Sequence, residues 1–115
     1  MQYMLLIYHN EANRMPPKEE AAVMQDYMTF TQDIVKNGKF KAGDRLEPTA
    51  NATTVRVRNG KTATVDGPFA ETKEQLGGYY LVEAKDLDEA IAIAAKIPGA
   101  KHGSIEVRPV FQMNR

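Results

Sequence analysis

Cysteine is absent from this 115-residue sequence. Its absence excludes a disulfide framework, a thiolate nucleophile and a cysteine-ligated zinc site. The sequence also lacks an excess of charge of one sign, since 15 Lys and Arg residues balance 15 Asp and Glu residues. A protein that binds nucleic acid normally presents a basic face to the phosphates. We therefore expect no nucleic-acid partner.

Long hydrophobic runs are missing as well. The first apolar run, Tyr3 to Tyr8, is far too short to span a membrane. It also lacks the basic flank and small-residue cleavage site of a secretory signal. We therefore expect a cytoplasmic protein with no membrane association. The length suits a single domain over residues 1–115.

The hydrophobic pattern divides the chain into strands and helices. Strands are predicted at 3–8, 40–46, 53–58, 61–65, 79–84 and 104–110, and helices at 18–37 and 87–97. The continuous apolar run of the first strand predicts burial on both of its faces. Pro109 suits an edge position for the last strand, because proline has no backbone donor.

Two short stretches of the sequence predict their local structure directly. Apolar residues recur at helical spacing between Lys18 and Asn37, and Gly38 is a suitable stop. The methionines and tyrosines of this helix are predicted to lie in the core and not to form a cofactor site. Asn59-Gly60 is the preferred type I′ turn and predicts a two-residue hairpin outside the core.

The order of these elements predicts an α+β fold. Two strand-helix-strand units, with the hairpin inserted between them, form the split βαβ or ferredoxin-like pattern. Right-handed crossovers place both helices on one face of the antiparallel sheet. The other face would be apolar and bare, which predicts a homodimer packed sheet to sheet. The alternative is that the hairpin folds back over this face.

The run from Val65 to Tyr79, VDGPFAETKEQLGGY, resembles the DGPF signature of the YCII-related family. The likeness extends to the start YMLLIY, the strand TTVR and the ending GSIEVRP. The resemblance implies a dimeric α+β barrel, but it does not indicate which activity the protein has. A His-Asp pair proposed for the wider family has no counterpart here. Tyr27 and Met28 occupy the centre of the first helix, and Ile97-Pro98-Gly99 replaces the acid near the end of the second.

The candidate site residues are predicted to meet at one end of the sheet. His9 ends the first strand and His102 precedes the last, and these strands are antiparallel neighbours in this topology. The connection that carries Asp66, Lys73 and Glu74 returns to the same end. Histidine beside a carboxylate is a common acid–base arrangement, and two histidines with a carboxylate could instead bind a divalent metal. The alternative is that the histidines are solvated loop residues, that Asp66 is a turn residue and that Glu71–Glu74 form a solvated helical turn.

These observations favour a dimer that binds a small molecule at that end of the sheet, near the DGPF segment. No phosphate-binding loop, serine-nucleophile elbow or zinc-helix motif is present, so we expect no cofactor and no metal. One alternative is an acid–base enzyme of the lyase, isomerase or cofactor-free oxygenase type, by analogy of fold. The other is a regulatory partner protein, because some relatives are encoded near extracytoplasmic-function sigma factors.

Overall fold

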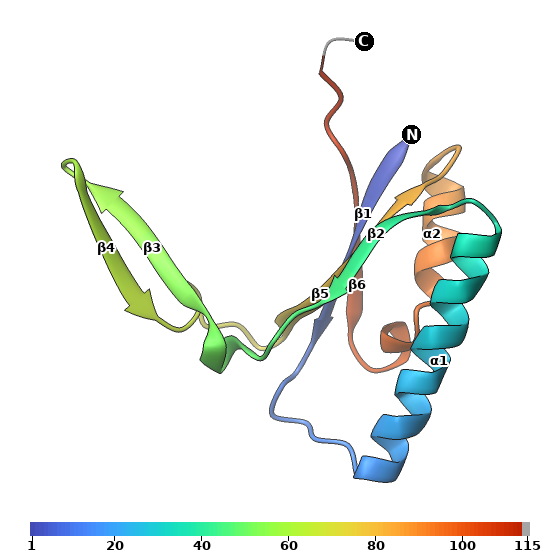
Figure 1. The fold of residues 1–115 in the computed structure, drawn as a ribbon, viewed down its shortest axis with the longest axis horizontal. Coiled ribbons are helices and arrows are strands. Elements are labelled where there is room, and N and C mark those ends of the chain that lie inside the picture. Colours follow the sequence, from blue (N-terminus) through green and yellow to red (C-terminus); the bar gives the residue numbers. More distant parts are fainter. Residues whose placement is uncertain (114–115) are drawn as a thin grey trace.

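The computed structural model describes residues 1–113 of the chain. A four-stranded antiparallel sheet has the order β2-β5-β1-β6, and β3 and β4 form a separate two-stranded sheet (Figure 1). The strands are β1 (Gln2–His9), β2 (Phe40–Arg45), β3 (Thr53–Arg58), β4 (Lys61–Asp66), β5 (Gln75–Glu83) and β6 (Ser104–Pro109). The helices are α1 (Pro17–Lys36) and α2 (Leu87–Ala95), with short 3₁₀ turns at Thr49–Asn51 and Pro98–Lys101. The predicted split βαβ order is confirmed.

Both helices lie on the same face of the four-stranded sheet (Figure 1). Helix α1 ends at Lys36, one residue before the predicted end, and Asn37 is its C-cap. Gly38 stops the helix as predicted, because it has φ 73° and its amide donates to the Val35 carbonyl. Asp86 begins α2 by accepting a hydrogen bond from the Glu89 amide. That helix ends two residues earlier than predicted, because the chain enters the turn that starts at Pro98. Neither described helix is both long and apolar enough to cross a membrane.

The core lies between the helices and the sheet. Leu5 and Val82 are completely buried, and Phe30 of α1 meets the Tyr80 ring edge to face at 5.2 Å. Burying side chains such as these stabilises the fold by about 1.5–3 kcal/mol each. The remaining core residues come from both layers: Tyr3, Ile7, Ile34, Ala84, Ala90, Ile93, Ala94 and Ile97.

The expectation that β1 is buried on both faces is wrong for the single chain. Its odd-numbered residues Tyr3, Leu5 and Ile7 are buried, whereas Met4 and Leu6 are half-exposed. The cause is that both helices cover the same side. The second face, called the open face below, has an apolar centre and a polar rim. Its centre consists of Met4, Leu6, Tyr8, Tyr79 and Leu81, and Asp44, Glu106 and Arg108 lie at the rim.

Strand β5 begins four residues earlier than predicted, at Gln75. The Gly77-Gly78 pair belongs to the ladder, where Gly78 pairs with Ile7 on one side and Arg45 on the other. A Cβ atom on Gly78 would stand 2.9 Å from the Asp44 carbonyl oxygen. Glycine therefore permits a close backbone approach here, and the strand continues through the pair.

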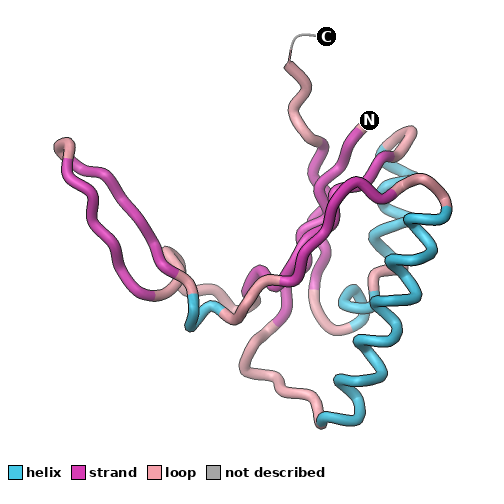
Figure 2. Tube along the Cα trace, in the orientation of Figure 1, coloured by secondary structure: helices cyan, strands magenta, loops and turns pink. Residues whose placement is uncertain are grey.

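Residues 53–66, called the arm below, form a hairpin outside the main sheet, as predicted. Asn59 and Gly60 have φ of 52° and 77°, as a type I′ turn requires. The arm projects on the side of the sheet opposite the helices (Figures 1 and 2). The radius of gyration is 16.3 Å, whereas a compact chain of this length would have about 13 Å. The hairpin does not fold back over the open face of its own sheet.

Replacing Gly60 with valine should change the free energy of unfolding by no more than about 1–2 kcal/mol. A β-branched residue is strained at φ 77°, but the strain falls on the arm and not on the main sheet. Urea unfolding followed by circular dichroism measures the change, with Lys61→Val as the control at a neighbouring strand position. A variant that no longer folds would show that the main sheet depends on the hairpin.

Candidate functional site

The ends of β1 and β6 lie together, as predicted for His9 and His102. His9 is the last residue of β1, and its imidazole packs on the backbone of Gly77: a Cβ there would stand 2.4 Å from the ring. Gly103 approaches the backbone of β1 so closely that a Cβ would stand 3.2 Å from the His9 Cα. His102, next in the chain to Gly103, is exposed at the end of the 3₁₀ turn. The topology therefore brings both histidine-bearing segments to one sheet end.

Glu74 joins the same place through its side chain. The Ser104 hydroxyl donates to a Glu74 carboxylate oxygen at 2.8 Å, so the entrance of β5 is tied to the start of β6. The Thr72 hydroxyl and the Gln75 amide form short hydrogen bonds to backbone carbonyls within residues 72–75. The approach to β5 is therefore an ordered, exposed turn. We call the group His9, Glu74, Gln75 and Ser104 the polar sheet end.

Glu11 also belongs to this region and was not singled out from the sequence. Its carboxylate accepts hydrogen bonds from the Thr49 hydroxyl at 2.6 Å and from the Thr49 amide at 3.0 Å. These bonds, the hydroxyl first, lower the pKa of Glu11 below its ordinary value. The Glu11 amide donates to the Gln75 side chain at 2.9 Å. The sequence position of Glu11, two residues after β1 at the predicted sheet end, was the one feature that could have marked it as a site residue.

Asp66 and Lys73 lie apart from that network. Asp66 ends β4, where it pairs with Thr53 at the root of the arm, and both side chains, Asp66 and Lys73, are exposed. Within residues 1–113, no hydrogen bond or ion pair links either of them to His9, His102 or Glu74. Across the same residues, no group of three His, Asp or Glu side chains has a geometry suited to a metal.

The DGPF turn is fixed by Gly67 and not by the Asp66 carboxylate. Gly67 has φ 99°, its amide donates to the Ala52 carbonyl at 2.7 Å, and its carbonyl accepts from the Thr54 hydroxyl at 2.8 Å. These bonds close the root of the arm, and glycine is needed because other residues are strained at this φ. Asp66 is thus free to serve a purpose other than forming its own turn.

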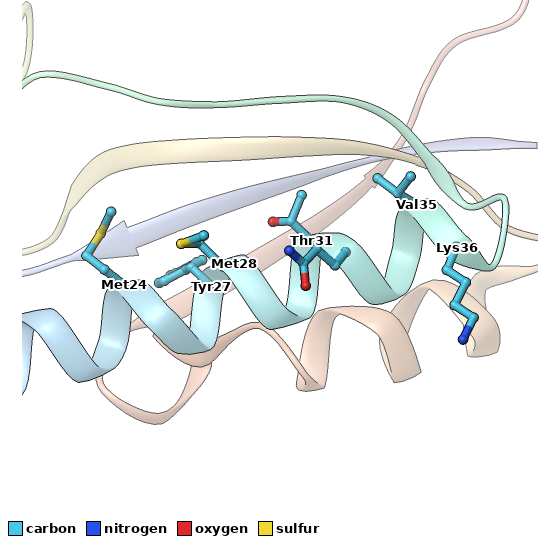
Figure 3. Close-up of a pocket in the computed structure, with 7 residues that line it drawn as sticks. Met24, Tyr27, Met28, Thr31, Val35 and Lys36 are labelled. Atoms are coloured by element: carbon cyan, nitrogen blue, oxygen red, sulfur yellow. The ribbon is translucent and has the colours of Figure 1, made fainter.

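A groove runs along α1, outside the predicted site. It is shallow and open to solvent, with a volume of about 480 Å³ and a mostly apolar lining. The side chains of Met24, Met28, Thr31 and Val35 point from the helix toward the β2 side (Figure 3). Met24 and Met28 are 42% and 54% exposed. The prediction that these methionines lie in the core is therefore wrong, because helical spacing alone does not reveal which residues another layer covers.

Two hydrogen bonds tie residues that line this groove, Tyr27 and Thr31, to the rest of the fold. The Tyr27 oxygen accepts a hydrogen bond from the Gly99 amide at 3.1 Å. The Thr31 hydroxyl is 2.6 Å from the Tyr80 hydroxyl. Burial raises the pKa of both Tyr27 and Tyr80 above the ordinary value, so both phenols are neutral at physiological pH.

Arg45 connects the groove to the polar sheet end. Its guanidinium contacts the Met24 sulfur at 3.4 Å. Its backbone pairs with Gly78 of β5. The preceding residue, Gly77, is the one on which the His9 ring packs. Arginine is always charged and presents a planar set of donors that matches a carboxylate. The groove therefore combines an apolar floor with a cation at the end nearer the histidines.

Comparisons with known proteins agree on family and fold. Residues 1–114 match the YCII-related domain. An uncharacterised protein of Rhizobium meliloti (strain 1021) is 41% identical over 114 residues, which cover 96% of this chain and 92% of that protein. Among solved structures, the chain is similar to the 5-chloro-2-hydroxyhydroquinone dehydrochlorinase of Burkholderia phenoliruptrix AC1100. The TM-score is 0.54 at 13% identity, over 98% of this chain and 96% of the other. That likeness shows the fold.

Proposed function

The chain belongs to the YCII-related family, and we propose that it is a homodimeric domain that binds a small molecule. The ligand is a mainly apolar ring with one acidic group. The ring lies in the α1 groove and the acidic group faces Arg45. The observation that carries this proposal is the contact of Arg45 with Met24, which places a cation at the end of an apolar groove.

The chemistry of the groove selects this class of ligand. An exposed apolar surface on α1 gains free energy when a ring displaces water from it, at about 25 cal/mol per Å². The Thr31 side chain lines the groove and offers a hydroxyl for hydrogen bonding without introducing a charge. Arg45 then provides a strong, charge-assisted hydrogen bond for a carboxylate or phenolate. The dehydrochlorinase, which has a similar fold, was solved with 2,5-dihydroxybenzoquinone, a small ring compound with acidic hydroxyl groups.

Three of the five residues singled out from the sequence form the polar border of this site in our proposal. His9 and Glu74 lie beyond Arg45 along the sheet end, and His102 precedes Gly103, which packs beside His9. These three residues would contact polar substituents of the ligand. Asp66, the last residue of β4, and Lys73, on the connection that leads into β5, mark a second location that lies apart from the groove. The open face, with Leu6 and Leu81 at its centre, is the surface through which two copies would pair.

Replacing Arg45 with methionine should weaken binding of an aromatic acid by about tenfold, because one exposed charge-assisted hydrogen bond contributes roughly 1–1.5 kcal/mol. Titration calorimetry with 2,5-dihydroxybenzoquinone and salicylate measures the affinity, and benzyl alcohol is the neutral probe. The affinity for benzyl alcohol should not change. Arg56→Met, which removes a cation from the arm, is the matched control and should bind like the wild type.

Two outcomes would count against this placement. If Arg45→Met binds both acids as well as the wild type does, Arg45 does not contact the acidic group. If Asp66→Asn or Lys73→Met reduces affinity while Arg45→Met and the groove-filling variant Met28→Trp do not, the ligand lies at the connection between β4 and β5 and not in the groove. If none of these variants changes the affinity, the ligand binds at neither of the two locations.

A further inference from the structure

We propose that the arm clasps a second copy of the chain, with one of its two faces buried against that copy. This inference rests on the homodimer proposed above and adds a second contact surface to it. The main sheet would then supply the centre of the interface and the arm its outer part. The argument comes from the direction of the arm, the chemistry of its two faces and its isolation from the rest of its own chain.

The direction of the arm places it beside any partner on the open face. Viewed down the shortest axis, the arm and the main sheet form the two limbs of a V, with the helices outside it (Figure 1). The molecule measures 47 × 47 × 19 Å, so the V lies in the plane of that view. A copy that covers the open face must enter the V. By two-fold symmetry it would also present its own arm to the first chain.

The two faces of the arm differ in charge. The strands pair Val55 with Thr64 and Val57 with Thr62, and antiparallel partners share a face. With Thr53 and Asp66 at the root, this face is β-branched and uncharged along most of its length. The opposite face carries Arg56, and also Arg58 paired with Lys61. Such alternation is typical of a hairpin with one face packed and the other in water.

The chain itself does not cover the uncharged face. Val55 and Val57 are 59% and 58% exposed. Among the described residues, the arm is fastened to the rest of the chain by hydrogen bonds only at its root, through Ala52, Thr54 and Gly67. An isolated two-stranded ribbon is only marginally stable in water. The uncharged face of the arm therefore needs another surface to cover it. A second copy that pairs with the open face would lie inside the V, beside the arm, and would provide that surface.

Changing both Val55 and Val57 to serine should weaken dimerisation by at least tenfold, because each change removes apolar area from the interface. Sedimentation equilibrium gives the dimer dissociation constant. Ala63→Ser, on the cationic face of the same arm, is the control and should leave this constant unchanged. Circular dichroism checks that the main sheet remains folded in each variant.

A cross-linking experiment decides which chain the arm contacts. The sequence has no cysteine, so Val57→Cys gives a single position for a photoreactive maleimide. In an equal mixture of ¹⁴N and ¹⁵N chains, exchanged before illumination, we expect cross-linked peptides that combine the two isotopes. Cross-links within single chains only would overturn the inference, as would an unchanged dissociation constant for the serine variant. In both cases the dimer itself would stand. A wild-type monomer would instead refute the homodimer and the clasp together.

Discussion

Replacing Leu81 with arginine should convert the proposed homodimer into a folded monomer. Leu81 lies at the centre of the open face, between Met4 of β1 and Ala42 of β2 in the strand register. In a sheet-to-sheet dimer the introduced guanidinium would be buried without a partner. An unpaired buried charge costs about 3–5 kcal/mol, which corresponds to a dissociation constant more than a hundredfold higher.

The fold of each chain should survive this change. The core lies on the other side of the sheet, where Leu5, Tyr80 and Val82 face the helices. Light scattering should therefore report the 12.8 kDa mass of a single chain, with a circular dichroism spectrum like that of the wild type. The melting temperature should fall, because the stabilisation linked to association is lost.

Ala95→Arg is the matched control, since Ala95 is exposed at the end of α2, on the far side of the sheet. It should remain a dimer. A wild-type protein that is monomeric at micromolar concentration would contradict the homodimer. A Leu81→Arg protein that remains a dimer would show that the two copies pair through another surface.

Short motifs that fit only one backbone conformation were predictable from the sequence. Asn59-Gly60 fixed the arm turn, because few residues accept positive φ at two successive positions. The glycine stop at Gly38 was likewise readable at the end of α1. Antiparallel order then brought the segments of His9 and His102 to one end of the sheet. Each of these rests on backbone geometry that sequence constrains directly.

The predicted crossovers already left one sheet face bare, and the structure has such a face. Which individual side chains lie buried or exposed was less predictable, because the apolar pattern of β1 does not show which of its two faces the helices cover. Met24 and Met28 have helical spacing, and yet no strand covers them. The contacts of Arg45 with Met24 and of Glu11 with Thr49 join residues 21 and 38 positions apart. Such pairs depend on the tertiary packing, for which a single sequence provides no signal.

Replacing Gly103 with alanine should destabilise the fold strongly, by at least about 2 kcal/mol. A Cβ on this residue would stand 2.0 Å from the Tyr8 carbonyl oxygen and 3.2 Å from the His9 Cα. Both atoms belong to the backbone of β1, which is held in the sheet between β5 and β6. The clash can therefore be relieved only by separating β6 from β1 where Tyr8 pairs with Ser104.

Gly77→Ala is the variant to compare with Gly103→Ala, because its new Cβ would clash with a side chain and not with the backbone. A Cβ on Gly77 would stand 2.4 Å from the His9 ring, and an exposed imidazole at a strand end can rotate away at small cost. Urea unfolding should show a much smaller loss of stability for Gly77→Ala than for Gly103→Ala, while the ring ¹H signals of His9 shift in the former. If the two variants lose equal stability, His9 is held rigidly on Gly77. The imidazole would then be a fixed part of the polar sheet end and could not turn toward a ligand.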